Sequence, residues 1–354
     1  MVVFNHLFII MLPNIQILEA VRVLGVFVAG FLVAFFITPL ASKMLYRFHA
    51  YKQIRGSESA PIFSSLHAKK SGTPTMGGII IWLTVLALVF LFWIFGSPFN
   101  FVDRAQTYLP IFTLAVAALI GLADDILGVL KIGPNGGGLG ISQKLAVYLL
   151  VSVIGAFWFY FPLDWDILNI PFIGSISIGW WYIPLFMFII VASAFSANET
   201  DGLDGLLGGV MLFAFIGLTV VAFALGRYHL AAFCAVIVGA LLAFLWFNIF
   251  PARFFMGDTG SMALGITMGV VAMLTNTTLL LPFFASILVL ESLSVIVQVV
   301  SKKIRHKKIF LSTPIHHHFE AIGWPETKVT MRFWIISAIF STLGVVLFFL
   351  SRIL

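Results

Sequence analysis

Residues 206–247 read LLGGVMLFAFIGLTVVAFALGRYHLAAFCAVIVGALLAFLWF and contain one charged side chain. The stretch holds two apolar runs, 206–226 and 230–247, and each is close to the roughly 20 residues that a helix needs to cross a bilayer. Acidic motifs flank the pair, with NETDGLDG (198–205) before it and FNIFPARFFMGDTGS (247–261) after it. The stretch therefore predicts two adjacent membrane-spanning helices whose polar flanks lie on the same side of the membrane.

The rest of the chain has the same apolar character. Of its 354 residues, 61% are hydrophobic and 10% are charged, and the mean hydropathy is +1.10. A soluble domain carries charges on about a quarter of its residues, so this composition excludes an ordinary water-soluble globule. We expect an all-α, polytopic membrane protein that forms a single domain over residues 1–354, a bundle of about ten transmembrane helices. Hydropathy predicts the spans near residues 20–44, 75–96, 107–123, 145–162, 179–197, 206–226, 230–247, 261–277, 280–300 and 332–351.

The placement of Lys and Arg predicts the orientation of this bundle. An even number of spans puts both termini on one side, and sixteen of the twenty Lys and Arg lie in odd-numbered loops or at the adjoining helix ends. Because cytoplasmic loops are enriched in Lys and Arg, we expect the odd loops inside and both termini outside. The net charge of +6 then reflects membrane topology, and we expect no nucleic-acid partner. On the outer side, residues 163–178 predict a small hairpin.

Every unusual motif falls in an odd-numbered loop. The motifs are HAKKSGTPTMGG (67–78), ADD (123–125), NETDGLDG (198–205), FNIFPARFFMGDTGS (247–261) and TPIHHHFEAIGWPE (313–326). Binding residues commonly sit on loops that a rigid scaffold positions. We therefore expect one composite cytoplasmic site, formed by loops near 45–74, 124–144, 198–205, 248–260 and 301–331. The basic run KKIRHKK (302–308) is interpreted as an anchor at the inner membrane surface, in contact with lipid head groups.

Acids beside the apolar runs are the first candidates for chemistry. Asp124 and Asp125 end one run, and burying a carboxylate near the bilayer costs about 3 kcal/mol, which indicates a partner or a function. Neighbouring helical residues point about 100° apart, so one carboxylate can hold a metal while the other takes a proton. A solvated helix end is the alternative. Asp201 and Asp204 share one face if helical, and capping of the next helix is their alternative.

Asp258 adds a fifth acid to a face that is otherwise positive. Mg²⁺ favours one or two carboxylates together with substrate phosphates. The only cysteine, Cys234, lies in an apolar run, which excludes an internal disulfide and a cysteine-based metal cluster. The acids therefore fit Mg²⁺ better than zinc, and they fit phosphoryl transfer, in which positioning and charge neutralisation supply most of the catalysis.

His316, His317 and His318 form a run inside the chain. Consecutive histidines do not present the i, i+4 pair of a helical zinc site. Imidazoles that face phosphates are our interpretation, because their pKa lies close to working pH; a solvated run is the alternative. Glu291 lies in the middle of a predicted span and has no assigned role.

Together these motifs resemble the polyprenyl-phosphate N-acetylhexosamine-1-phosphate transferases. GTPTMGG, the DD pair, TDGLDG, FNxxPAxxFMGDTGS and TPIHHHFE occur in family order, and the resemblance runs from about Arg22 to the C-terminus. TPIHHHFE with GTPTMGG resembles the phospho-N-acetylmuramoyl-pentapeptide branch. The resemblance implies a ten-helix bundle with outside termini in the bacterial inner (plasma) membrane, with a cytoplasmic active site; a homodimer is typical of the family.

The implied reaction is the first membrane step of peptidoglycan synthesis. Undecaprenyl phosphate attacks UDP-MurNAc-pentapeptide in the presence of Mg²⁺, and the products are lipid I and UMP. Asp258 matches the magnesium aspartate of the family, and Asp124 matches the carboxylate often proposed to deprotonate the lipid phosphate. The implied catalytic set is Asp124, Asp125, Asp258, His316, His317 and His318.

The resemblance also implies a set of substrate-binding residues. Phe255 matches the residue that stacks on uracil, and a loop containing Asn198 matches the nucleoside side of the site. The full implied set is Lys70, Thr75, Asn198, Asp201, Asp204, Asn248, Phe255, Gln298 and either Lys144 or Lys131. The choice between the two lysines stays open, because the expected lysine matches Lys144 only with a shortened spacing. Glu199 departs from the family, which usually has an apolar residue there, and it adds negative charge to the nucleoside contact.

Two other functions are alternatives to this one. The first is a related enzyme that uses UDP-GlcNAc as the sugar donor. The second is a transporter of nucleotide sugars or divalent cations, and such carriers place their polar groups near the bilayer midplane. Here the acids cluster on one face of the membrane, which favours the transferase.

Overall fold

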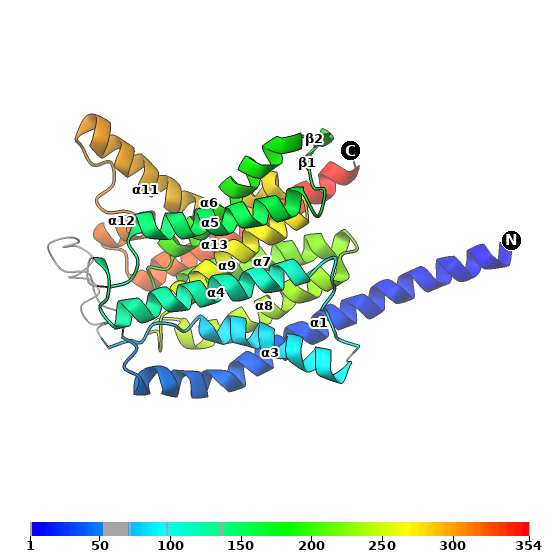
Figure 1. The fold of residues 1–354 in the computed structure, drawn as a ribbon, viewed down its shortest axis with the longest axis horizontal. Helices are drawn as coiled ribbons and strands as arrows, with labels where there is room; N and C mark the ends of the chain where they lie inside the picture. Colours follow the sequence, from blue (N-terminus) through cyan, green and yellow to red (C-terminus); the bar gives the residue numbers. More distant parts are fainter. Residues whose placement is uncertain (1, 52–69, 71, 97, 135–136, 354) are drawn as a thin grey trace.

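The chain folds into an elongated bundle of helices (Figure 1). The computed structural model describes residues 2–51, 70, 72–96, 98–134 and 137–353. Seven helices within this part of the chain are long and apolar enough to cross a membrane. They are α1 (Val2–Arg47), α4 (Tyr108–Val129), α5 (Ile141–Tyr160), α6 (Tyr182–Thr200), α7 (Leu206–Ala224), α8 (Tyr228–Asn248) and α13 (Glu326–Ile353).

Further helices complete the bundle. A span broken by a 90° bend combines η4 (Thr278–Leu280) and α10 (Leu281–Phe284) with α11 (Ser286–Arg305). Two shorter apolar helices are α3 (Ile79–Phe95) and α9 (Asp258–Leu274). Each of the ten predicted stretches coincides with one of these helices or with the bent pair, which confirms the predicted all-α, polytopic membrane class.

Several predicted boundaries were wrong. The first span was predicted to begin near residue 20, but α1 begins at Val2, and two other differences bear on the polar motifs. The third span was predicted to end at residue 123, but α4 continues to Val129. The last span was predicted to start at residue 332, but α13 starts at Glu326. Hydropathy falls where charged residues begin, whereas a helical backbone continues as long as its side chains find partners. Asp124 and Asp125 therefore lie within a helix and not beyond its end.

The centre of the bundle is α9. Every residue from Thr259 to Leu274 is buried, and α9 packs against α4 and α6. Helices in a membrane associate mainly through close packing, which small residues at the contact permit. Gly265 of α9 is such a residue, because an added Cβ would overlap Ser193 and Ala197 of α6. The remaining spans surround this centre, with α1 against α8 and α13 against α7.

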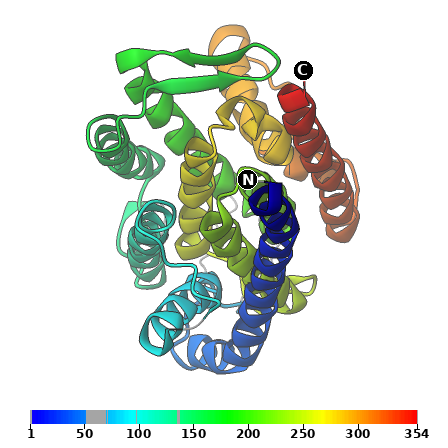
Figure 2. The same cartoon turned by 90° about the vertical axis from the view of Figure 1, so that its right-hand side faces the viewer.

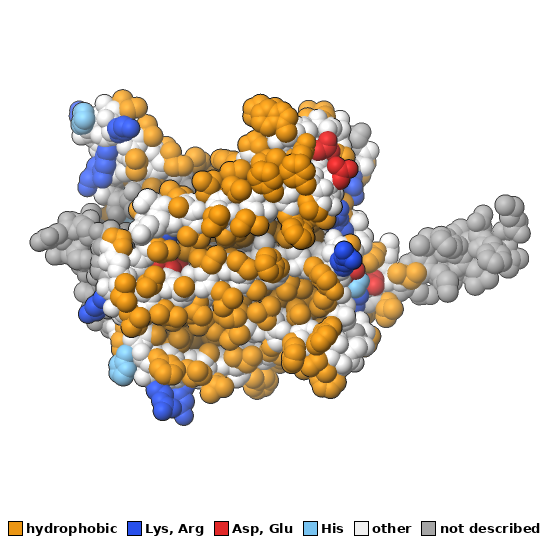
Figure 3. All heavy atoms as spheres, in the orientation of Figure 1, with side chains coloured by type: hydrophobic (Ala, Val, Ile, Leu, Met, Phe, Trp, Pro, Cys, Tyr) orange, Lys and Arg blue, Asp and Glu red, His pale blue; other side chains and the backbone are white. Residues whose placement is uncertain are grey.

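The two ends of the bundle differ. Both termini lie at one end, and the loops that hold the polar motifs lie at the other (Figure 1). Figure 2 looks at the terminal end, where β1 (Ile167–Ile170) and β2 (Gly174–Ser177) pair as an antiparallel hairpin. The predicted hairpin at 163–178 is thereby confirmed. Figure 3 shows hydrophobic side chains over the middle of one face, with Lys and Arg gathered towards its ends, as a membrane protein requires.

Candidate active site

Four helices bring a carboxylate–lysine cluster together at the motif end of the bundle. The cluster consists of Asp124 on α4, Lys144 on α5, Asn198 on α6 and Asp258 at the start of α9. The Lys144 Nζ lies 2.9 Å from Asp124 Oδ2 and 2.6 Å from Asp258 Oδ2. Asn198 Nδ2 donates to the other oxygen of Asp258, and the backbone N–H of Leu139 donates to Asp124 at 2.5 Å. One ammonium thus joins two carboxylates from two different helices.

Asp125 faces a different partner from Asp124. Its Oδ2 accepts a hydrogen bond from the backbone N–H of Thr259 at 2.9 Å, and Thr75 Oγ1 donates to its Oδ1 at 3.4 Å. A carboxylate at this place satisfies a free N–H in the first turn of α9 and offsets the positive end of the helix dipole. The two helices approach closely here, because a Cβ added to Gly121 would overlap the backbone of Asp258.

The loop 201–205 holds the segment 248–258 in place. Asp201 Oδ2 accepts from the backbone N–H of Gly257 at 3.1 Å, and Asp204 Oδ2 accepts from that of Ala252 at 2.9 Å. Asn248 binds both segments, since its Oδ1 accepts from the backbone N–H after Asp204 at 3.0 Å and its Nδ2 donates to a carbonyl of 248–258 at 2.7 Å. These carboxylates bind backbone of a neighbouring loop, whereas the alternative interpretation had them cap the next helix.

A second charged cluster surrounds Lys70. The Lys70 Nζ lies 2.6 Å from Asp204 Oδ1 and 2.5 Å from Glu326 Oε1. The same Glu326 oxygen accepts from the backbone N–H of Asp204 at 2.6 Å. The Lys70 ammonium also lies 5.7 Å from the centre of the half-buried Phe255 ring. Lys70, Asp204 and Phe255, three of the predicted substrate-binding residues, are therefore neighbours.

The three histidines differ in their surroundings. They begin α12 (Ile315–Ala321), and His316 is fully buried. His316 Nδ1 lies 3.0 Å from Glu291 Oε2, and His317 Nδ1 lies 2.7 Å from Glu320 Oε2. His318 is half-buried and accepts a backbone N–H from the preceding loop at 3.2 Å. A solvated run is therefore excluded for His316.

Charge around His316 decides its protonation. Burial by itself lowers the pKa of an imidazole, because it disfavours the charged form. The charge and hydrogen bond of Glu291, with the charges of Glu320 and Glu199, outweigh burial and raise the pKa of His316 above its ordinary value. An imidazolium paired with a carboxylate is the arrangement that these groups favour.

Two further predicted residues lie away from the clusters. Gln298 is buried on α11, and both ends of its amide bind the following loop. Its Oε1 accepts from the backbone of Ile309 at 2.9 Å, and its Nε2 donates to the carbonyl of Phe310 at 2.8 Å. Lys131 is exposed in the turn after α4. Of the two lysines left open by the sequence, Lys144 is the one that contacts the carboxylates.

The donor atoms of the carboxylate–lysine cluster suit a magnesium ion. No set of three or more His, Cys, Asp or Glu converges as a ready-made metal cage within the described ranges. Mg²⁺ does not need one, because it usually binds through one or two carboxylates, substrate phosphates and water. Asp124 and Asp258 are hard oxygen donors that already share one cation, the Lys144 ammonium. The residues present therefore fit Mg²⁺ bound together with a phosphate ligand.

Direct contacts join all five sequence motifs at the end of the bundle opposite the termini (Figure 1). The histidine motif reaches the loop 201–205, because a Cβ added to Gly202 would overlap the His316 ring. The other contacts are Thr75 with Asp125, Asp125 with Thr259, Asn198 with Asp258, Lys70 with Asp204, and Glu326 with Asp204. The motifs therefore form one continuous polar region.

Sequence reasoning left three glutamates of this region without a role. Glu291 pairs with His316, Glu320 pairs with His317, and Glu326 pairs with Lys70. A signal existed for Glu320, which stands three residues after His317 and so shares its face of a helix. Glu326 ends the same motif. Glu291 is far from its partner in the sequence, and only the fold brings the two together.

The chain is similar to known proteins over most of its length. A family model described as Glycosyl transferase family 4 matches residues 107–276, and Phospho-N-acetylmuramoyl-pentapeptide-transferase signature 1 matches residues 70–81. A phospho-N-acetylmuramoyl-pentapeptide-transferase of Geobacillus sp. (strain WCH70) is 39% identical over 93% of this chain and 98% of the relative. Proteins with the same description from Geobacillus thermodenitrificans and Clostridium novyi are each 40% identical, over 89% of this chain and 94% and 93% of the relatives.

Proposed function

We propose a function from one premise: the chain belongs to the phospho-N-acetylmuramoyl-pentapeptide-transferase family, on its identity of 39% to a relative that it covers almost completely. We propose that it transfers phospho-MurNAc-pentapeptide from UDP-MurNAc-pentapeptide to undecaprenyl phosphate, giving lipid I and UMP. In this reaction a phosphate oxygen of the lipid bonds to the sugar-bearing phosphorus of the donor. The bond from that phosphorus to the bridging oxygen breaks, and UMP leaves with the electron pair.

The observation that carries this proposal is the position of Lys144 between Asp124 and Asp258. Asp258 is the carboxylate that would hold Mg²⁺, and the ion would neutralise charge on the diphosphate and on the departing UMP. Asp124, on the other side of the same ammonium, either orients the lipid phosphate or takes its proton. Lys144 itself can turn to phosphate oxygens, because an ammonium is a compact, mobile donor.

The nucleoside end of the donor would lie at the Lys70 cluster. Phe255 offers an aromatic face for uracil, and Lys70 lies beside this ring. Asp204 and Glu326 hold the lysine in place. Such a site would select a planar base through stacking and the adjacent charge.

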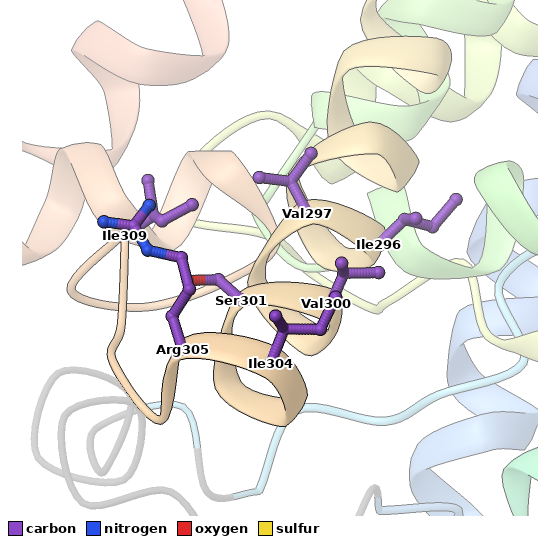
Figure 4. A pocket seen from close by; sticks show the side chains of 7 residues that line it. All are labelled: Ile296, Val297, Val300, Ser301, Ile304, Arg305 and Ile309. Carbon is purple, nitrogen blue, oxygen red and sulfur yellow. The ribbon is translucent and has the colours of Figure 1, made fainter.

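The lipid acceptor needs a route from the bilayer. An open hollow of about 260 Å³ lies along α11, lined by apolar side chains such as Ile296, Val300 and Ile304, with Arg305 beside them. Figure 4 shows these side chains on the helix. Apolar walls next to a guanidinium suit a polyprenyl chain that ends in a phosphate. We propose that the chain of the acceptor lies in this hollow, and that the motif end of the bundle faces the cytoplasm of a bacterial inner membrane, in line with the distribution of Lys and Arg.

An assay for UMP tests the proposal. Protein purified in detergent is given undecaprenyl phosphate and either UDP-MurNAc-pentapeptide or UDP-GlcNAc, with Mg²⁺ or with EDTA. We expect UMP from the muramoyl donor alone, and only with Mg²⁺. UMP from UDP-GlcNAc would favour the related enzyme. No UMP from either donor would overturn the proposed function and leave transport, which requires no bond cleavage.

A further inference from the structure

Glu291 is a buried acid that the proposed reaction does not use. It lies on α11 and its side chain is completely buried. Its Oε2 lies 3.0 Å from Nδ1 of His316 and 3.4 Å from the backbone N–H of the same residue. Within the part of the chain that the structure describes, its Oε1 has no hydrogen-bond partner. A carboxylate is expensive at such a place, so its single strong contact indicates a purpose.

His316, the partner of Glu291, packs against the loop 201–205. The ring of His316 lies so close to the backbone of Gly202 that even a methyl group there would overlap Nε2. The His317 ring lies 4.0 Å away, between ring centres, and limits movement in another direction. The His316 ring therefore fills the space between α11 and this loop and fixes the distance between them.

The loop in turn positions the residues at the start of α9. Asp201, next to Gly202, accepts the backbone N–H of Gly257 at 3.1 Å. Asp258 follows Gly257 directly and belongs to the carboxylate–lysine cluster. A continuous series of contacts thus runs from Glu291 through His316 and the loop to Asp258.

We propose that Glu291 is a positioning residue, which fixes His316 against Gly202 and thereby sets the place of the 201–205 loop and of Asp258 during turnover. The inference rests on the proposed function, because turnover is its main readout. Displacements of about 1 Å at a reacting group can lower the rate about a hundredfold, so a pair of residues outside the reacting groups can affect turnover through their position.

Charge supports the same assignment. His316 faces Glu291 from α11, Glu320 from its own helix α12 and Glu199 from α6, with His317 beside it. The charges of these acids raise the pKa of the His316 ring and so favour its charged form, and a charged ring binds a carboxylate more strongly than a neutral one. Replacing Glu291 by an uncharged residue of the same size would weaken its contact with His316 and would leave the packing at this position unchanged.

The test compares Glu291→Gln with wild type in the UMP assay. We expect kcat to fall about thirtyfold while KM for both substrates changes less than about threefold, as for an interaction that matters in the transition state and not in binding. The alkaline limb of the kcat profile should move to lower pH, because the ring loses its proton more easily. Glu291→Asp, which withdraws the carboxylate by one methylene, replaces Glu291→Gln if that variant does not accumulate as folded protein. We expect Glu291→Asp also to lower kcat with little change in KM.

Two further variants separate positioning from general stability. Ser292→Ala removes a 2.7 Å hydrogen bond from α11 to Ser196 of α6; we expect a lower melting temperature and an unchanged pH profile. The double variant Glu291→Gln with His316→Gln should be no slower than His316→Gln alone, because Glu291 acts through that ring.

The outcomes are distinguishable. Additive losses in the double variant, or an unchanged kcat and pH profile in Glu291→Gln, would overturn the role of Glu291 while wild type still releases UMP. No UMP from wild type would instead refute the proposed function.

Discussion

At the scale of single residues, the site is organised by side chains that bind two partners at once. Lys144 joins Asp124 to Asp258, and Lys70 joins Asp204 to Glu326. Each pair comes from segments far apart in the chain. A buried charge that loses its partner is costly, so these lysines hold the site together as well as supply charge.

Replacing Lys144 should therefore be far more harmful than replacing Lys131. In Lys144→Met two carboxylates lose their shared cation, and we expect UMP release to fall about a hundredfold or more, as when one electrostatic stabiliser is removed. Lys131→Met is the matched control, because this side chain is exposed in the turn after α4. Steady-state rates and melting temperatures of both variants provide the check. Full activity in Lys144→Met, with loss in Lys131→Met, would reverse the choice between them.

The pair of His316 and Glu291 should also make stability depend on pH. Burial lowers the pKa of His316, but the charges around the ring, above all that of Glu291, outweigh burial. The pKa is therefore higher in the folded protein than in the unfolded chain. The pair then contributes its full stability below about pH 6.5, the unfolded pKa, and loses it as pH rises through the folded pKa. The melting temperature of wild type minus that of Glu291→Gln, measured without substrate, should be largest near the acidic end and shrink as pH rises. A difference that grows with pH would contradict this sign.

At the scale of helices, the register between α4 and α9 places the carboxylates of the candidate site. Asp125 binds the first turn of α9, and Gly121 lets the two backbones meet. The sequence could predict both helices from their apolar runs. It could not predict that Asp125 binds the first turn of α9, because the sequence does not show which residue contacts each of two adjacent acids. The same holds for Asn248 and Gln298, whose amides bind backbone of nearby loops.

Adding one methyl group should separate α4 from α9. In Gly121→Ala the new Cβ overlaps the backbone of Asp258, and such overpacking typically costs about 1–3 kcal/mol. We expect a lower melting temperature and at least about a tenfold loss of UMP release, since the carboxylates move apart. Gly128→Ala lies on the same helix with no atom close to its Cβ position, so it should change neither. Equal behaviour of the two variants would refute the importance of this contact.

At the scale of the whole molecule, composition alone predicted the class of protein, and ten apolar stretches predicted its helices. The even number of predicted spans indicated that both termini share one end, as Figure 1 shows. The sequence could also group the five motifs on one face. It could not assign partners within that face, because pairs such as Glu291 with His316 depend on the 90° bend before α11.

Labelling of introduced cysteines should reveal which end faces the cytoplasm. The native Cys234 is fully buried and should not react. The segment after α11 and the segment before β1 lie at opposite ends of the bundle (Figure 1), and Lys308 and Asp164 in these segments are exposed. In intact spheroplasts an impermeant maleimide should label Asp164→Cys and spare Lys308→Cys until the membrane is opened. The reverse pattern would invert the proposed orientation.

The burial of α9 has a consequence for how the protein responds to its host lipid. With 17 residues, α9 is only about 25 Å long, shorter than a typical hydrocarbon core of about 30 Å. An exposed helix of that length would tilt or thin the bilayer around it. Sealed inside its neighbours, α9 never meets an acyl chain, so the helix that begins with Asp258 is insulated from membrane thickness, while the outer helices absorb any mismatch.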